Sequence, residues 1–250
     1  MQAIRSLIYV FLFVSWSTFI VSLNAIFLPF PRSVSQATIR VWMYGTMMLL
    51  RVVVGLRYEI RGMERVPEGP VIFASKHQSA WDTAIYYMFD KDPAYILKKE
   101  LLKIPLYGLT LRKAGHIAID RDGGMSTLKH VLRETRRAIQ EKRSVIIFPE
   151  GTRTLPGEPR TYQPGVAAIY KDAGVPLIPV ALNSGSFWGR SGYIKYPGCI
   201  VMEFLPPIPS GLNRKVFMKE LQQQVDEASE RLRLEAETKY GLEPAIKAEN

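Results

Sequence analysis

A histidine and an aspartate stand five residues apart in the segment His77-Gln78-Ser79-Ala80-Trp81-Asp82. Residues at this spacing do not share a face of a regular helix or strand, so contact between the two side chains needs a turn between them. Ser79 can supply that turn as the N-cap of a helix that runs to Met88, which would fold the carboxylate of Asp82 back toward His77. A carboxylate that keeps one imidazole nitrogen protonated leaves the other free to accept a proton. The spacing therefore predicts a general base.

Two short apolar runs, residues 69–76 and 144–148, predict buried strands. The first ends just before His77, and the second ends just before a polar turn. Ligands of open α/β sheets bind outside the carboxyl ends of the strands. This position favours chemistry at His77 over the alternative, a capped helix with a purely structural role.

The polar turn is Pro149-Glu150-Gly151-Thr152-Arg153, and its residues suit an anion. Gly151 allows close approach of a backbone, and the planar fork of Arg153 matches phosphate oxygens. The alternative is a strand-end turn in which Glu150 and Arg153 form a surface ion pair. The turn is thus a candidate phosphate site.

Four motifs follow one another along the chain. They are His77 to Asp82; Lys99-Glu100-Leu101 with Pro105, Gly108, Gly115 and Ile119-Asp120-Arg121; Phe148-Pro149-Glu150-Gly151-Thr152-Arg153; and Val175-Pro176-Leu177-Ile178-Pro179-Val180. In this order and spacing they resemble the glycerolipid acyltransferases, most closely the bacterial 1-acylglycerol-3-phosphate acyltransferases. Two positions depart from the family pattern. Lys76 stands where the family often has Asn, and Tyr162-Gln163-Pro164-Gly165 replaces a segment with a Phe and lysines before the glycine.

The resemblance implies transfer of a fatty acyl group from a thioester of acyl carrier protein or coenzyme A to lysophosphatidic acid, giving phosphatidic acid for phospholipid biosynthesis. It implies that His77 and Asp82 are catalytic. It also implies that the acceptor is bound by Glu150, Gly151, Thr152, Arg153 and Arg121. The nucleophile would be the glycerol hydroxyl of the substrate, so no acyl-enzyme is needed and a G-x-S-x-G elbow is not expected. The sequence has no zinc-type Cys/His cluster, P-loop or dinucleotide fingerprint, so no metal or tightly bound cofactor is implied. The thioester is a substrate.

Composition and charge limit the partners of the chain. Its 250 residues are 47% apolar, and 33 Lys and Arg against 23 Asp and Glu give a net charge of +10. Such a charge suits nucleic acid or an anionic surface. An aromatic and basic nucleic-acid motif is absent from the sequence, whereas an apolar segment is present, so we expect a membrane partner and no nucleic acid.

The apolar segment runs from residue 6 to residue 31, without a charged residue between Arg5 and Arg32. This length can cross a hydrocarbon core, and it is too long for a cleaved signal peptide. A second apolar stretch covers residues 41–56. We expect a helical hairpin that enters one leaflet, with the catalytic part on the cytoplasmic face of the inner cell membrane, where thioester donors are available. The alternatives are a single-pass anchor and a buried core helix.

Strands and helices alternate along the rest of the chain, which predicts an α/β fold. We expect a mixed, largely parallel central sheet flanked by helices, with the N-terminal apolar hairpin attached to it. Residues 1–56 would form the membrane-associated segment and residues 57–250 the acyltransferase domain. Amphipathic helices are predicted over residues 126–141 and 217–232. His116 and His130 are interpreted as structural and solvated, respectively.

Three other functions stay open at this point. The acceptor of the acyl group could be another lysolipid. His77 could activate water instead, making the protein a thioesterase or lipase, which would release free fatty acid with or without an acceptor. The chain could also be a non-catalytic, membrane-bound lipid-binding protein; intact His77, Asp82 and Arg153 argue against this last function.

Overall fold

The computed structural model describes residues 1–120, 123–190 and 193–243. Within these residues, seven strands form one sheet in the order β1-β7-β6-β2-β5-β3-β4. The strands are β1 (Leu56–Arg61), β2 (Ile72–Ser75), β3 (Ala94–Lys98), β4 (Ile117–Ile119), β5 (Val145–Ile147), β6 (Leu177–Leu182) and β7 (Gly198–Phe204). Only the pairing of β6 with β7 is antiparallel. The prediction of a mixed, largely parallel sheet is confirmed.

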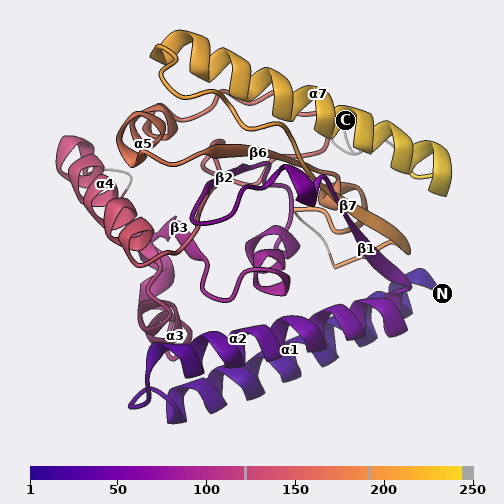
Figure 1. Ribbon diagram of the computed structural model, residues 1–250. Coiled ribbons are helices and arrows are strands. Elements are labelled where there is room, and N and C mark those ends of the chain that lie inside the picture. Colours follow the sequence, from indigo (N-terminus) through magenta and orange to yellow (C-terminus); the bar gives the residue numbers. More distant parts are fainter. Residues whose placement is uncertain (121–122, 191–192, 244–250) are drawn as a thin grey trace.

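Helices cover both faces of the sheet. They are α1 (Gln2–Ile26), α2 (Arg32–Leu49), α3 (Tyr107–Lys113), α4 (Gly124–Gln140), α5 (Gly165–Ala173), α6 (Ser184–Phe187) and α7 (Arg214–Tyr240). The shorter ones are the π-helical η1 (Leu50–Val54) and the 3₁₀ helices η2 (Met63–Arg65), η3 (Trp81–Thr83), η4 (Ile85–Met88) and η5 (Lys99–Lys103). α4, α5 and α7 lie on one face, and α1 and α2 lie on the other (Figure 1). A parallel sheet with both faces covered explains why its central strands are continuous apolar runs.

Helix α7 shows how the sequence specifies one of these layers. Asn213 caps its N-terminus, because its Oδ1 accepts a hydrogen bond from the backbone N–H of Val216 at 3.0 Å. Buried residues then recur at helical spacing: Phe217, Leu221, Val225, Ala228, Leu232 and Ala236. The helix ends at Gly241, whose φ of 62° is readily adopted by glycine. The predicted C-terminal amphipathic helix is confirmed, and it packs on β6.

Neighbouring residues of β2 face opposite layers. Ile72 and Ala74 belong to the cluster beneath α4, α5 and α7. Phe73 belongs to the cluster that includes residues of the hairpin. Because side chains alternate along a strand, continuation of this pattern past Ser75 directs Lys76 toward the α7 layer and His77 toward the hairpin layer.

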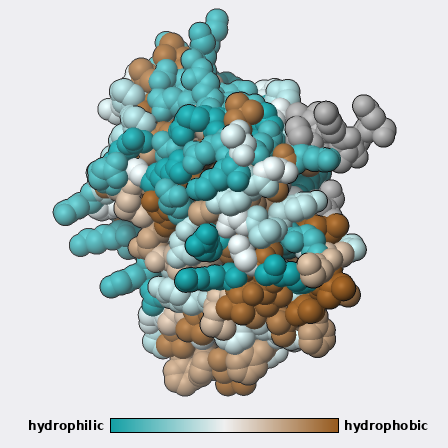
Figure 2. Space-filling view, turned by 90° about the vertical axis from the view of Figure 1, so that its right-hand side faces the viewer, coloured by the Kyte–Doolittle hydropathy of each residue, from teal (hydrophilic) through white to brown (hydrophobic). Residues whose placement is uncertain are grey.

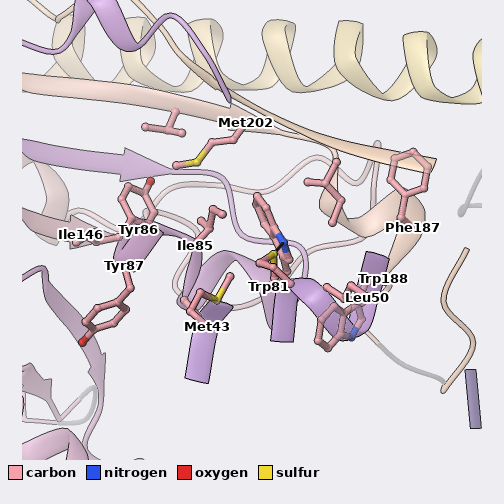
Figure 3. Close-up of a cluster of buried hydrophobic side chains, with 14 of the residues drawn as sticks. Met43, Leu50, Trp81, Ile85, Tyr86, Tyr87, Ile146, Phe187, Trp188 and Met202 are labelled. Atoms are coloured by element: carbon pink, nitrogen blue, oxygen red, sulfur yellow. Dashed lines mark hydrogen bonds between the residues drawn. The ribbon is translucent and has the colours of Figure 1, made fainter. Parts of the chain in front are cut away.

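The N-terminal helices α1 and α2 form the predicted hairpin, and they share a core with the sheet. Figure 3 shows Trp81 in one buried cluster with Met43 of α2, Leu50 of η1 and Met202 of β7. The indole N–H of Trp81 also donates to the sulfur of Met47 at 3.3 Å. The hairpin therefore serves as one helical layer of the fold. The division at residue 56 into two domains stays a prediction.

The outer surface of the hairpin is apolar. Figure 2 shows hydrophobic side chains gathered on the part of the molecule formed by α1 and α2, below a largely hydrophilic body. The exposed apolar side chains here include Leu7, Phe11, Phe19, Tyr44 and Met48. Two spans, Gln2–Ile26 and Arg32–Val54, are long and apolar enough to cross a membrane. The second helix begins at Arg32, earlier than the predicted apolar stretch, because polar residues at its start pack toward α1, as Ser35 does by donating to Asn24 Oδ1 at 2.9 Å.

Candidate active site

The predicted contact between His77 and Asp82 is present just past the carboxyl end of β2. Nδ1 of His77 lies 3.1 Å from Oδ2 of Asp82. The same oxygen accepts hydrogen bonds from the backbone N–H groups of Gln78 at 2.6 Å and Ser79 at 2.8 Å. Asp82 is fully buried. These bonds fix the carboxylate, which in turn fixes the imidazole.

The predicted helix from Ser79 to Met88 is wrong in form, although its capping contacts occur. Ser79 Oγ accepts a hydrogen bond from the backbone N–H of Trp81 at 3.0 Å, and Asp82 folds back onto Ser79. The chain then makes two 3₁₀ helices, η3 and η4, separated at Ala84, whose φ of −129° is not helical. Short polar side chains that bond the nearby backbone compete with a regular helix.

The partner of Nδ1 determines what the other ring nitrogen can do. A carboxylate only accepts hydrogen bonds, so Nδ1 carries the proton that His77 donates to Asp82. Nε2 then has a free lone pair and can accept a proton. The imidazole ring also stacks on Phe148, with ring centroids 4.1 Å apart and planes 22° apart. The site thus holds an oriented base.

The backbone of His77 is held from both sides by the turn that follows β5. Its N–H donates to Oε2 of Glu150 at 2.8 Å. Its carbonyl accepts from the backbone N–H of Thr154 at 2.8 Å and from Thr154 Oγ1 at 3.2 Å. β2 and β5 are parallel neighbours, so their carboxyl ends meet at one edge of the sheet. This arrangement joins the first and third motifs.

Glu150 lies inside the protein, with only 1% of its surface exposed. Oε1 lies 2.8 Å from Nζ of Lys76 and accepts from Thr154 Oγ1 at 3.0 Å. Burial raises the pKa of the Glu150 carboxyl, and the nearby ammonium of Lys76 opposes that shift. The alternative interpretation, a surface ion pair between Glu150 and Arg153, is wrong, because Glu150 is buried and pairs with Lys76.

The other predicted acceptor residues lie around the same turn. Gly151 has a φ of 72°, and its N–H donates to the carbonyl of Phe148 at 2.9 Å. Thr152 and Arg153 are partly exposed. Arg153 directly precedes Thr154 and so begins beside the backbone of His77. Within the described residues, the guanidinium of Arg153 forms no ion pair.

The last predicted acceptor residue, Arg121, lies outside the described residues. Its neighbour Asp120 is described, and Oδ2 of Asp120 lies 3.0 Å from Nζ of Lys99. The second motif thus contains an ion pair between its first and last blocks.

Sequence reasoning missed two residues that complete this region. Thr154 follows the third motif directly, and its contacts with His77 are described above. Asp226 of α7 lies 2.9 Å from Nζ of Lys76. A lysine at the end of a buried strand signals a need for acidic partners, but the sequence did not indicate which ones.

The arrangement suits proton abstraction next to the turn that the sequence predicts to bind an anion. Among residues 1–120, 123–190 and 193–243, no three His, Cys, Asp or Glu side chains gather where they would hold a metal ion. The expectation of no metal and no bound cofactor stays a prediction.

The sequence of this chain is similar to those of known proteins. The family model described as "Acyltransferase" matches residues 57–183. The 1-acyl-sn-glycerol-3-phosphate acyltransferase of Pseudomonas aeruginosa is 37% identical over 203 residues, which cover 80% of this chain and 78% of that protein. The human 1-acyl-sn-glycerol-3-phosphate acyltransferase beta is 30% identical over 162 residues, or 63% of this chain and 58% of that protein.

The fold is also found in a solved structure. The crystal structure of the 1-acyl-sn-glycerophosphate (LPA) acyltransferase of Thermotoga maritima matches with a TM-score of 0.74 at 22% identity. The match covers 93% of this chain and 98% of that one. At this identity the likeness establishes the fold.

Proposed function

Because the chain belongs to the acyltransferase family, we propose that it transfers a fatty acyl group from a thioester to the free sn-2 hydroxyl of 1-acyl-sn-glycerol 3-phosphate. The product is phosphatidic acid. The single observation that carries this proposal is the His77–Asp82 contact at the end of β2, with Asp82 fixed by two backbone N–H groups. The proposed reaction and acceptor are those in the names of the relatives described above.

His77 acts as the general base in this proposal. Nε2 takes the proton of the sn-2 hydroxyl as its oxygen attacks the thioester carbonyl carbon. The carbon–sulfur bond then breaks, and the imidazolium returns its proton to the leaving thiolate. Asp82 keeps Nδ1 protonated throughout and stabilises the imidazolium. A positioned base of this kind contributes about 10²–10⁴ in rate.

The turn after β5 binds the acceptor phosphate. Arg153 is the main candidate, because it directly precedes Thr154, whose N–H donates to the His77 carbonyl, and because it is partly exposed. Thr152 offers a hydroxyl, and Gly151 leaves room for a phosphate to approach the backbone. Glu150 has a different role: its carboxylate is buried and bonded to the backbone of His77, which supports positioning of the base rather than contact with the acceptor. Arg121 is retained as an acceptor residue on the resemblance alone.

The acyl donor is a thioester of acyl carrier protein or coenzyme A, which is a substrate and leaves after transfer. The excess of basic residues suits either donor, since both are anionic. The two donors are distinguished by comparing rates with each.

The hairpin holds the enzyme in one leaflet, on the cytoplasmic face of the cell membrane. Two observations support attachment of the hairpin to a leaflet. The outer surface of α1 and α2 is apolar, and the β2 alternation directs His77 toward the same side of the sheet as the hairpin. The base would then meet a lysolipid whose chain stays in the bilayer, while soluble thioesters approach from the cytoplasm.

Acyl transfer by membranes containing the protein tests the proposal. They receive a labelled thioester with either lysophosphatidic acid or a lysolipid whose phosphate is capped, and a His77→Ala sample runs alongside. Phosphatidic acid formed only with the first acceptor, and lost in His77→Ala, is the expected result. Transfer to the capped acceptor would indicate a different lysolipid, and free fatty acid alone would indicate a hydrolase.

A further inference from the structure

Both positions at which the chain departs from the family pattern contact the same side chain on α7. Nζ of Lys76 lies 2.9 Å from Oδ1 of Asp226. The hydroxyl of Tyr162 donates to that same oxygen at 3.3 Å. Lys76 and Tyr162 lie far apart in the sequence, and Asp226 lies far from both. The tertiary structure thus joins Lys76 and Tyr162 through one carboxylate.

Lys76 is a buried cation with two acidic partners. Only 5% of its surface is exposed. Its Nζ also lies 2.8 Å from Oε1 of Glu150, whose side chain is fully buried. An ammonium in such a place needs compensating charge. Burial lowers the pKa of Lys76, but the two carboxylates outweigh burial and raise it overall, so the lysine stays charged.

The second oxygen of Glu150 connects this ion pair to the base. Oε2 accepts the backbone N–H of His77 at 2.8 Å, while Oε1 holds both Lys76 and Thr154 Oγ1. Contacts therefore run without a break from Asp226 through Lys76 and Glu150 to the main chain of His77. Lys76 and His77 are adjacent in the chain and face opposite layers of the fold. α7 is thus linked to a base on the other side of the sheet.

We propose that Lys76 is a positioning residue for His77, and that Asp226 and Tyr162 hold Lys76 for this task from α7. Lys76 keeps the buried Glu150 in its ionised, bonded place, and Glu150 fixes the backbone from which the imidazole projects. The inference rests on the proposed function of His77 as the base. It predicts that loss of Lys76 lowers turnover without weakening acceptor binding, because the Lys76 ammonium is buried between Glu150 and Asp226 and is not exposed to a substrate.

The test is a set of full-length variants assayed in membranes for kcat and KM, with rates expressed per folded enzyme. Lys76→Met should lower kcat about 10–10²-fold, a size typical of a base displaced by about 1 Å. KM for lysophosphatidic acid should stay within about twofold, because the contacts that bind the acceptor are unchanged. Asp226→Asn should lower kcat by about fivefold and Tyr162→Phe by about twofold, since each leaves the Lys76–Glu150 pair in place.

A charge-matched double variant distinguishes positioning of His77 from a purely structural role of Lys76 in attaching α7 to the sheet. Lys76→Met combined with Glu150→Gln removes the cation together with the carboxylate it neutralises. The amide oxygen of glutamine can still accept the His77 N–H. The double variant should therefore have a higher kcat than Lys76→Met alone. It also keeps the test informative where the single variant folds poorly, because no unpaired buried charge remains.

Glu235→Gln is the matched control on the same helix. Glu235 pairs with Arg61 of β1 at 2.8 Å, so it too ties α7 to a strand, but in the described part of the chain its hydrogen bonds and ion pairs do not reach the His77 region. This variant should lower the melting temperature and leave kcat unchanged. A wild-type kcat in folded Lys76→Met, or a double variant no faster than the single one, would overturn the inference. Failure of the proposed function looks different, because the wild-type enzyme itself would then form no phosphatidic acid.

Discussion

The two histidines His77 and His116 differ in the partner that holds Nδ1. In His77, Nδ1 faces the carboxylate of Asp82, so it carries the proton and Nε2 is left to accept one. In His116, Nδ1 accepts the backbone N–H of Tyr95 at 3.3 Å. Its Nε2 then carries the proton, 3.1 Å from the hydroxyl oxygen of Tyr87. The same residue type therefore has opposite tautomers, and only one of them presents a base.

The surroundings of the two histidines also fit these different roles. Burial, and then the nearby Arg143, lowers the pKa of His116 to about 3, so its ring is neutral in the folded protein. Its ring lies edge-on to Tyr95. His77 instead stands at the end of β2, beside a turn with a partly exposed arginine. The comparison teaches that the neighbour of one ring nitrogen determines whether the other serves chemistry or packing.

Replacing each histidine is the most direct way to break this comparison. His77→Ala should lower kcat about 10²–10⁴-fold, because the base is lost. His116→Gln should keep kcat within about threefold, since a side chain that only supports the fold, here through packing and hydrogen bonds, changes stability rather than turnover. The measurement is acyl transfer per folded enzyme. Equal losses of kcat in the two variants would contradict the assignment.

Changing the partner of Nδ1 should make His77 resemble His116. Asp82→Asn offers an amide that can donate to Nδ1, which favours the wrong tautomer, and kcat should fall about 10²-fold. KM should change little. Asp172→Asn is the control, because Asp172 pairs with Arg136 on the surface at 2.7 Å. A kcat for Asp82→Asn equal to that of this control would argue against an orienting role for Asp82.

The pH dependence of the free energy of unfolding should reflect the protonation of His116. The unfolded chain protonates this residue below about pH 6.5, whereas the folded chain resists protonation down to about pH 3. The stabilisation is thus fully present above pH 6.5 and is lost as pH falls. Between pH 7 and pH 5, His116 should lower the free energy of unfolding by about 2 kcal/mol, with a slope of at most about 1.4 kcal/mol per pH unit.

Denaturant unfolding of the detergent-solubilised protein measures this effect. The curve for His116→Gln should be flatter over the same pH range, because its amide does not titrate. Parallel curves for the two proteins would show that His116 titrates alike in both states.

Two arginines, Arg143 and Arg153, show a similar contrast between a structural role and a proposed role in substrate binding. Arg143 is buried and donates to backbone carbonyls, including that of Ala114 at 3.0 Å. Arg153 is partly exposed, in the turn whose next residue, Thr154, bonds the backbone of His77. Arg153→Ala should raise KM for lysophosphatidic acid about tenfold with little change in kcat, as expected for one charge-assisted hydrogen bond. Arg153→Lys should also be harmful, because an ammonium lacks the planar fork. A fall in kcat at unchanged KM would count against phosphate binding by Arg153.

Local patterns predicted much of the fold and the centre of the site. The apolar runs before His77 and Pro149 became β2 and β5, because a strand buried on both faces must be apolar throughout. The stripe over residues 126–141 became α4, and the N-terminal apolar stretches became a hairpin. The helix predicted after Ser79 was wrong, since side-chain bonds to the backbone divided it into 3₁₀ turns.

The sequence by itself determined the contact between His77 and Asp82, because five residues and one capping serine leave the chain few ways to turn. Only the tertiary structure decided that Glu150 would hold the His77 backbone. It also decided that Lys76 would be neutralised by Asp226, which lies 150 residues away in the chain. A buried charge requires some partner, which is a local property. Which partner it finds depends on how the helices pack across the sheet, and no short stretch of sequence records that.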